Sequence, residues 1–164
     1  MTGEVVIDGA LFLGMHATDE DMRRSCKAFF CRHLHDEVTM SLEHVGWCDD
    51  VVWAHPRAVQ DAYYPFMDTL HTDMTIHRVG YEQADIDSVR NARYLADLPM
   101  RERLLLGLVL RRGAVLHTAS PRLRTRHDLP LKAVPAAAAE DRFPQPLEQR
   151  YQVSLALRLP IEEL

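Results

Sequence analysis

Acidic residues stand beside the expected ends of three buried segments. Asp8 directly follows the apolar run at residues 5–7, Glu43 lies in the first turn of a helix after a second strand, and Glu102 opens the helix before a later strand. In a parallel sheet with helical crossovers, these positions meet at one edge. Carboxylates brought together there repel one another unless a cation neutralises them, and their hard oxygen atoms favour Mg²⁺ or Mn²⁺. The pattern therefore predicts a divalent metal site.

Each of these acids also has an ordinary structural role open to it. Asp8 can cap the turn into the next helix, and Glu43 and Glu102 can complement the dipoles of the helices that they open. Glu43 and Asp50 are seven residues apart, nearly two helical turns, so they fall on one side of their helix. That side either presents two carboxylates to a common point or is a solvated acidic face.

A metal ion held by such acids would suit chemistry on a phosphodiester. One or two ions can generate a hydroxide nucleophile and stabilise the leaving oxygen. Arginine side chains, which hold phosphates through paired hydrogen bonds, are concentrated near the last of the three acids. They are Arg111, Arg112, Arg122, Arg124 and Arg126.

The segment at residues 102–123 predicts a helix, a tight turn and a buried strand in succession. Leucine side chains are spread over most of the circumference of the helix, and Gly113 suits the left-handed position just past a helix end. The apolar run at residues 114–116 then leads into Thr118 and Ser120. Ligands of open parallel sheets gather where strands end at their carboxyl side, so both hydroxyls are expected at the site.

The other elements follow from hydrophobic periodicity and from turn residues. Helices are predicted at residues 18–34, from Ser41 to the break at Pro56, and at residues 59–72 and 82–92. Short apolar strands are predicted at residues 5–7, 38–40, 75–79, 114–116 and 131–134. This alternation predicts an α/β fold, a three-layer α/β/α sandwich with a central, mostly parallel sheet.

Length and composition fit one domain with a sizeable core, followed by an extension. The chain has 164 residues, of which 47% are hydrophobic. We place the domain at residues 1–134 and a linker with a C-terminal extension at residues 135–164. Residues 151–159 alternate apolar and polar side chains, which predicts a strand that pairs with its own sheet or with a second subunit. A homodimer is therefore expected.

Charge and cysteine content narrow the possible partners and compartment. A formal net charge of -5 argues against coating nucleic acid by bulk charge. The three cysteines show no CxxC spacing, which argues against a disulfide framework or a thiolate zinc site. No segment resembles a signal peptide, and no apolar run reaches the roughly 20 residues that a membrane span needs. We expect a cytoplasmic protein that does not enter the membrane.

The order of these motifs resembles the PIN domain, the fold of many metal-dependent ribonucleases, including toxins of bacterial toxin–antitoxin pairs. The resemblance covers roughly residues 4–134 and rests on VVID at residues 5–8, an acid after Ser41, and ERLLLGLVLRRGAVLHTASPRL at residues 102–123. It implies that Asp8 and Glu102 bind metal, and that Glu43 or Asp50 matches the acid of the third helix. Ser120 departs from the family pattern, which usually has an aspartate there.

The resemblance implies a Mg²⁺- or Mn²⁺-dependent ribonuclease that hydrolyses RNA phosphodiesters, with an antitoxin-like protein as a possible partner. Its catalytic acids would be Asp8, Glu43 and Glu102. The candidate metal ligands are Asp8, Glu43, Asp50, Glu102 and Ser120. The candidate RNA contacts are Thr118, Arg122 and Arg124. Two alternatives stay open: a degenerate PIN-like binding or interaction module without nuclease activity, and a small-molecule biosynthetic enzyme that reuses the acidic cleft.

Overall fold

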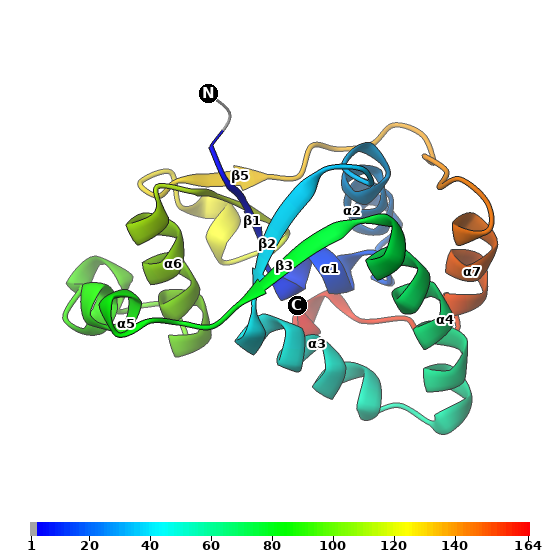
Figure 1. The fold of residues 1–164 in the computed structure, drawn as a ribbon, viewed down its shortest axis with the longest axis horizontal. Helices are drawn as coiled ribbons and strands as arrows, with labels where there is room; N and C mark the ends of the chain where they lie inside the picture. Colours follow the sequence, from blue (N-terminus) through cyan, green and yellow to red (C-terminus); the bar gives the residue numbers. More distant parts are fainter. Residues whose placement is uncertain (1–2) are drawn as a thin grey trace.

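The computed structural model describes residues 3–164 and contains a five-stranded, all-parallel sheet (Figure 1). The strands lie in the order β3-β2-β1-β4-β5. Their bounds are β1 Val5–Ile7, β2 Glu37–Ser41, β3 Thr75–Val79, β4 Val115–Thr118 and β5 Leu131–Ala133. The first strand of the chain, β1, lies at the centre, where it pairs with β2 on one side and β4 on the other. Strands β2 and β3 lie on one side of β1, and β4 and β5 lie on the other, so the strand order reverses at β1. Ligands of such sheets bind at this switch point.

Helices connect the strands and cover both faces of the sheet. They are α1 Gly9–Gly14, α2 Glu20–Arg32, α3 Leu42–Trp53, α4 Arg57–Asp73, α5 Gln83–Arg90, α6 Met100–Arg112 and α7 Leu147–Ser154. Short 3₁₀ turns stand at Arg93–Leu95, Leu123–Thr125 and Ile161–Glu163. Within residues 3–164, none of these helices combines the length and apolar character needed to cross a bilayer.

Two hydrophobic cores lie on opposite faces of the sheet. Because side chains of a strand alternate, Val6 belongs to a core cluster with residues of α5 and α6, whereas Ile7 belongs to a cluster with residues of α1 to α4 and α7. Figure 1 shows α5 and α6 on one side of the strands and α2, α4 and α7 on the other. The predicted α/β/α sandwich is therefore confirmed, with every strand pair parallel.

Local sequence signals account for several of the element boundaries. Ser41 caps α3, because its hydroxyl accepts a hydrogen bond from the backbone N–H of His44. Gly113 ends α6 in the left-handed conformation, with φ of 61°, and lets β4 begin two residues later. The predictions of a helix, a turn and a buried strand in this region are confirmed.

The predicted strand at residues 151–159 is wrong. Residues up to Ser154 belong to α7, where Tyr151 and Ser154 are buried three residues apart, as a helix requires. A turn follows at residues 155–156, and after it Leu157 and Leu159 are buried and Leu159 forms a single bridge to Ala17. The alternation thus came from two different structures in succession. The extension contributes to the core shared with α1 to α4, through α4–α7 packing in particular.

Buried ion pairs attach this extension to α2. Lys27 is fully buried and donates hydrogen bonds to Glu148 at 2.8 Å and to Glu140 at 3.0 Å. Its ammonium group also lies over the ring of Tyr151, 4.6 Å from the centroid. Arg23 donates to the same Glu140 and to the hydroxyl of Tyr151. Since an unpaired buried charge is costly, these contacts fix where the extension docks.

Lys27→Met should therefore destabilise the protein strongly. The substitution leaves Glu148 buried without its cation, and we expect a loss of about 3 kcal/mol in the free energy of unfolding, measured by urea denaturation. Arg57→Ala removes an exposed ion pair with Asp61 and serves as the control, with an expected loss below about 0.5 kcal/mol. Equal losses in the two variants would contradict the proposed anchoring role of Lys27.

Candidate functional site

A cleft of about 400 Å³ opens at the carboxyl ends of β1 and β4. Its walls come from the ends of β1 and β4, from α3, from the start of α6 and from the C-terminal segment. The polar residues that line it are Asp8, His44, Arg101, Glu102, Ser120 and Arg122. Trp47 and Leu164 supply apolar walls. Two of the three acids that the sequence placed at one edge, Asp8 and Glu102, thus meet in one cavity.

Asp8 is fixed by the local structure at the end of β1. It is the N-cap of α1, where its Oδ1 accepts a hydrogen bond of 2.7 Å from the backbone N–H of Leu11. Its Oδ2 accepts a hydrogen bond from the hydroxyl of Thr118, the last residue of β4. The backbone N–H of Ser120 in turn donates to the Thr118 oxygen at 2.9 Å. Asp8 therefore caps α1 and also lines the cleft.

Glu102 is held from the loop after β4. Its Oε1 accepts hydrogen bonds from the hydroxyl of Ser120 at 3.1 Å and from two nitrogens of Arg122 at 2.6 and 3.1 Å. Its Oε2 is buried and has no hydrogen-bond partner among the described residues. A buried carboxylate oxygen without a partner is costly, so this atom marks a place for a cation, a water or a ligand donor.

The electrostatic environment of the cleft is unfavourable for two bare carboxylates. Burial is the largest cause that raises the pKa of Asp8 to about 6, and the negative charge of Glu102 raises it further. Hydrogen bonds from Thr118 and from the Leu11 backbone act in the opposite direction. Near neutral pH, the cleft therefore carries negative charge. Arg122 forms an ion pair with Glu102 and not with Asp8.

Helix α3 does not bring its acids into the cleft. Glu43 is exposed and accepts a hydrogen bond from the hydroxyl of Tyr81, which also donates to Ser41. Asp50 is also exposed, as expected for the other member of a seven-residue spacing. The α3 side chains that line the cleft are those of His44 and Trp47. The structure thus separates Glu43 and Asp50 from Asp8 and Glu102.

A helical stripe in the sequence could have identified this face of α3. His44, Cys48 and Val52 recur every four residues and are all buried, so they mark the side turned toward the sheet. Glu43 stands one position before that stripe and points elsewhere. His44 is the functional candidate that the sequence interpretation missed. That interpretation selected the acidic residues of α3 by their type and did not ask which face of the helix is buried.

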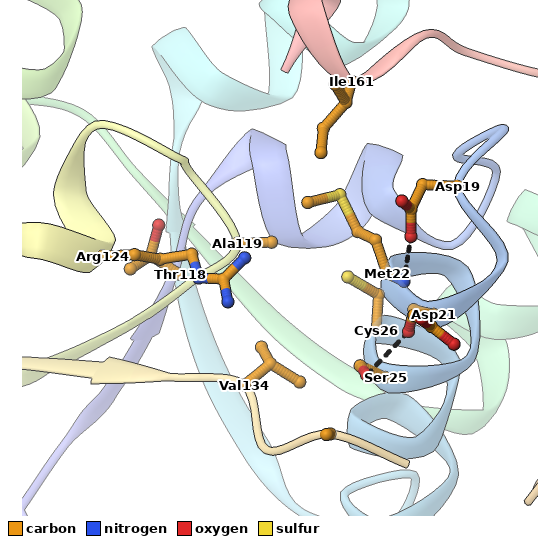
Figure 2. A pocket seen from close by; sticks show the side chains of 11 residues that line it. Asp19, Asp21, Met22, Ser25, Cys26, Thr118, Ala119, Arg124, Val134 and Ile161 are labelled. Atoms are coloured by element: carbon orange, nitrogen blue, oxygen red, sulfur yellow. Dashed lines mark hydrogen bonds between the residues drawn. The ribbon is translucent and has the colours of Figure 1, made fainter. Parts of the chain in front are cut away.

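Two of the three candidate RNA contacts lie around a second cavity, of about 190 Å³ (Figure 2). Figure 2 shows Arg124 extending its guanidinium group toward α2, where Met22 and Cys26 line the opposite wall. Thr118 lines this second cavity as well as contacting Asp8. Arg122, in contrast, lies in the cleft with Glu102. The basic residues after β4 are therefore divided between two neighbouring hollows.

The donor set of the cleft is small for a metal centre. Over residues 3–164, the structure contains no group of three or more His, Cys, Asp or Glu side chains placed to hold a metal ion. The cleft provides two carboxylates, Asp8 and Glu102, with hydroxyl groups at Thr118 and Ser120 next to them. Mg²⁺ keeps several waters and commonly takes only one or two carboxylates, so this set fits one hydrated ion.

The chain belongs to DUF6190, a family of unknown function whose model matches residues 1–164. A comparison with curated proteins finds no significant match.

The raised pKa of Asp8 predicts how stability depends on pH. Because the folded value, about 6, is above the ordinary value of 3.8, the folded state binds the extra proton between these two values. This contribution to stability is present below about pH 4 and is lost as the pH rises through about 6. The size of the loss is about 3 kcal/mol, from about 1.4 kcal/mol for each pKa unit.

Asp8→Asn, which imitates the protonated group, isolates this contribution. We expect the stability difference between Asp8→Asn and wild type to grow in favour of the variant by about 2 kcal/mol from pH 4 to pH 7.5, because the unfolded carboxylate is already partly ionised at pH 4; urea denaturation in EDTA measures it. A pH-independent difference for Asp8→Asn would contradict the burial of a charged Asp8.

Proposed function

We propose that this member of DUF6190 is a PIN-like hydrolase that cleaves RNA phosphodiesters with Mg²⁺ or Mn²⁺ bound in the cleft between Asp8 and Glu102. The observation that carries the proposal is the unpartnered Oε2 atom of Glu102, which is buried in the same cavity as a second carboxylate. A hard divalent cation would both coordinate the unpartnered oxygen and neutralise the excess negative charge of the two carboxylates.

The residues present fit such an ion. Asp8 and Glu102 would hold it directly, and the hydroxyl groups of Thr118 and Ser120 keep these two carboxylates in place. Ser120 is neutral where the PIN pattern usually has an aspartate, so the site would carry a weaker negative field than the full pattern. When bound, the ion would activate a water molecule and stabilise charge on the phosphate.

The chain's own residues would do the rest of the work. Arg122 and Arg101 line the cleft and can bind phosphate oxygens by charge-assisted hydrogen bonds. Arg101 is held over the ring of Trp47, with its guanidinium carbon 4.2 Å from the centroid, so its direction is fixed before a ligand arrives. Trp47 and Leu164 form apolar walls that limit the access of water to the bound phosphate.

A second candidate function is RNA binding without cleavage, the role of a degenerate PIN-like module. The paired hydrogen bonds from two nitrogens of Arg122 to Oε1 of Glu102 favour it, because Arg122 already neutralises one of the two acids. The place of His44 and Trp47 on the α3 wall, where a further acid was expected, favours it too. Under this function the cleft would bind the phosphate backbone but would lack the charge to hold a metal ion.

The remaining expectations about partners stay predictions. The segment predicted as a pairing strand forms α7 and packs in the core of the same chain, so the homodimer stays a prediction without support from a terminal strand. An antitoxin-like partner and a cytoplasmic place of action rest on the PIN resemblance and on the sequence composition.

Cleavage assays with paired variants test the proposal. Wild-type protein should cleave single-stranded RNA oligonucleotides in Mn²⁺, and Asp8→Asn and Glu102→Gln should each lower kcat by about 10²-fold or more, because each removes one of two ligands. Glu43→Gln, an acid of α3 outside the cleft, should stay within about threefold of wild type, as should Asp61→Asn.

The pattern of results separates the two candidate functions. RNA binding by wild-type protein, with no Mn²⁺-dependent product that is lost in Asp8→Asn, would support the binding module and contradict the hydrolase. A loss of cleavage in Glu43→Gln as large as that in Asp8→Asn would contradict the placement of the site in this cleft.

A further inference from the structure

We propose that His44 is a neutral hydrogen-bond donor that holds a phosphate oxygen in the cleft, with its Nε2–H group as the donating atom. This inference deepens the proposed function, on which its RNA substrate rests, and assigns a ligand-positioning role to a residue of α3. The chemistry that His44 recognises is an anionic oxygen of a phosphate, whether that phosphate belongs to an RNA backbone or is free in solution.

One backbone contact fixes which ring nitrogen of His44 carries the proton. The N–H group of Gly9 donates a hydrogen bond of 2.8 Å to Nδ1 of His44. Nδ1 must therefore be the acceptor, and in a neutral ring the proton lies on Nε2. Gly9 directly follows Asp8 at the start of α1, so the tautomer of His44 is set by the same turn that places the first carboxylate.

The imidazole ring is neutral throughout the physiological range. Burial, followed by the positive charge of Arg101, lowers the pKa of His44 to about 4, while the nearby backbone of Arg101, which lies outside hydrogen-bond geometry of Nε2, raises it. His44 thus offers a donor without adding a positive charge beside Arg101 and Arg122. A protonated Nε2 also has no lone pair for a metal, so His44 is not a metal ligand in this arrangement.

The donor is a buried, unpartnered atom of a side chain that lines the cleft. His44 is 2% exposed and lines the cavity with Asp8 and Glu102. Its Nε2 atom has no hydrogen-bond partner anywhere in the part of the chain that the structure describes. A buried donor left unpaired costs about 1–3 kcal/mol, so its retention is explained if a ligand atom accepts from it. This is a second unsatisfied polar atom in the cavity, besides Oε2 of Glu102.

Packing holds the ring in its orientation. The ring of Trp47 meets that of His44 edge to face, with centroids 5.6 Å apart and an interplanar angle of 88°. On the other side, α1 approaches α3 so closely that a Cβ atom on Gly9 would lie 2.4 Å from the Trp47 ring. This close packing and the contact with the Gly9 N–H group hold the ring of His44 in one orientation.

A phosphate oxygen is the acceptor that matches the remaining charges. Arg101 and Arg122 line the same cavity as Glu102 and His44, so the cavity offers an anionic group two cations and one neutral donor. Asp8 and Glu102 would repel that anion unless a divalent cation lies between them and it. The same cleft then has separate places for a cation, at the carboxylates, and for a phosphate oxygen, at His44.

Two substitutions separate the donor role of His44 from its structural role. His44→Asn can keep an acceptor for the Gly9 N–H group but removes the donor at the Nε2 position. His44→Gln can place an amide N–H group near that position and loses the acceptor. We expect His44→Asn to weaken RNA binding in Ca²⁺ about tenfold, measured by fluorescence anisotropy, and His44→Gln to stay within about threefold of wild type. The control is His35→Asn, at an exposed histidine, which should bind as wild type does.

Nitrogen-15 NMR of the imidazole provides a readout that does not depend on cleavage. Free wild-type protein should show His44 as the neutral Nε2–H tautomer at pH 7, and its Nε2–H signal should shift on addition of an RNA oligonucleotide with Ca²⁺. A parallel titration with inorganic phosphate and Ca²⁺ shows whether free phosphate, rather than the RNA backbone, supplies the oxygen that His44 binds. A shift with phosphate but none with RNA supports the donor role and contradicts RNA as the substrate.

Three results would overturn the proposal. They are a His44 tautomer with the proton on Nδ1, an Nε2–H signal that shifts with neither RNA nor phosphate, and wild-type RNA affinity in a folded His44→Asn variant. A reduced affinity in His44→Gln together with wild-type affinity in His44→Asn would show that the Gly9 contact, and not the donor, matters. None of these results requires cleavage, so the inference and the hydrolase proposal can fail separately.

Discussion

The burial of two carboxylates at one edge of a parallel sheet is the constraint on which the site depends. Asp8 reaches this edge because a central strand ends there and the next helix needs an N-cap. Glu102 reaches it because α6 starts beside the loop that follows β4. Each acid is partly satisfied, Asp8 by a hydroxyl and a backbone N–H, Glu102 by Ser120 and Arg122. What stays unsatisfied, one carboxylate oxygen and one imidazole N–H, defines what the cleft is able to bind.

The sequence predicted the layers of the fold because they depend on local and periodic signals. A short β-branched run before Asp8, a Ser cap at α3 and a left-handed Gly113 each act within a few residues. The five strands were all identified, and their parallel order follows from helices between successive strands. The strand predicted near the C-terminus was wrong because the apolar alternation runs across two structures: Val153 is exposed on α7, and Leu157 and Leu159 are buried in the segment after it.

The site was harder to predict, because it depends on which face of a helix meets the sheet. Asp8 and Glu102 lie at strand and helix ends, where position alone sets direction. Glu43 is only one residue from His44, yet 100° of helical rotation turns it toward Tyr81 while His44 is buried. The proton on Nε2 of His44 comes from a contact with Gly9, 35 residues away in the chain. No short-range pattern contains that information.

The central claim is that Asp8 and Glu102 together hold one divalent cation, and Mn²⁺ titration calorimetry tests it most directly. Wild-type protein should bind one Mn²⁺ per chain, and a folded Glu102→Gln variant, which keeps the size of the side chain and loses its charge, should bind Mn²⁺ at least about tenfold more weakly. Unchanged Mn²⁺ affinity in that variant, or no binding to wild type at millimolar Mn²⁺, would contradict a metal site in this cleft.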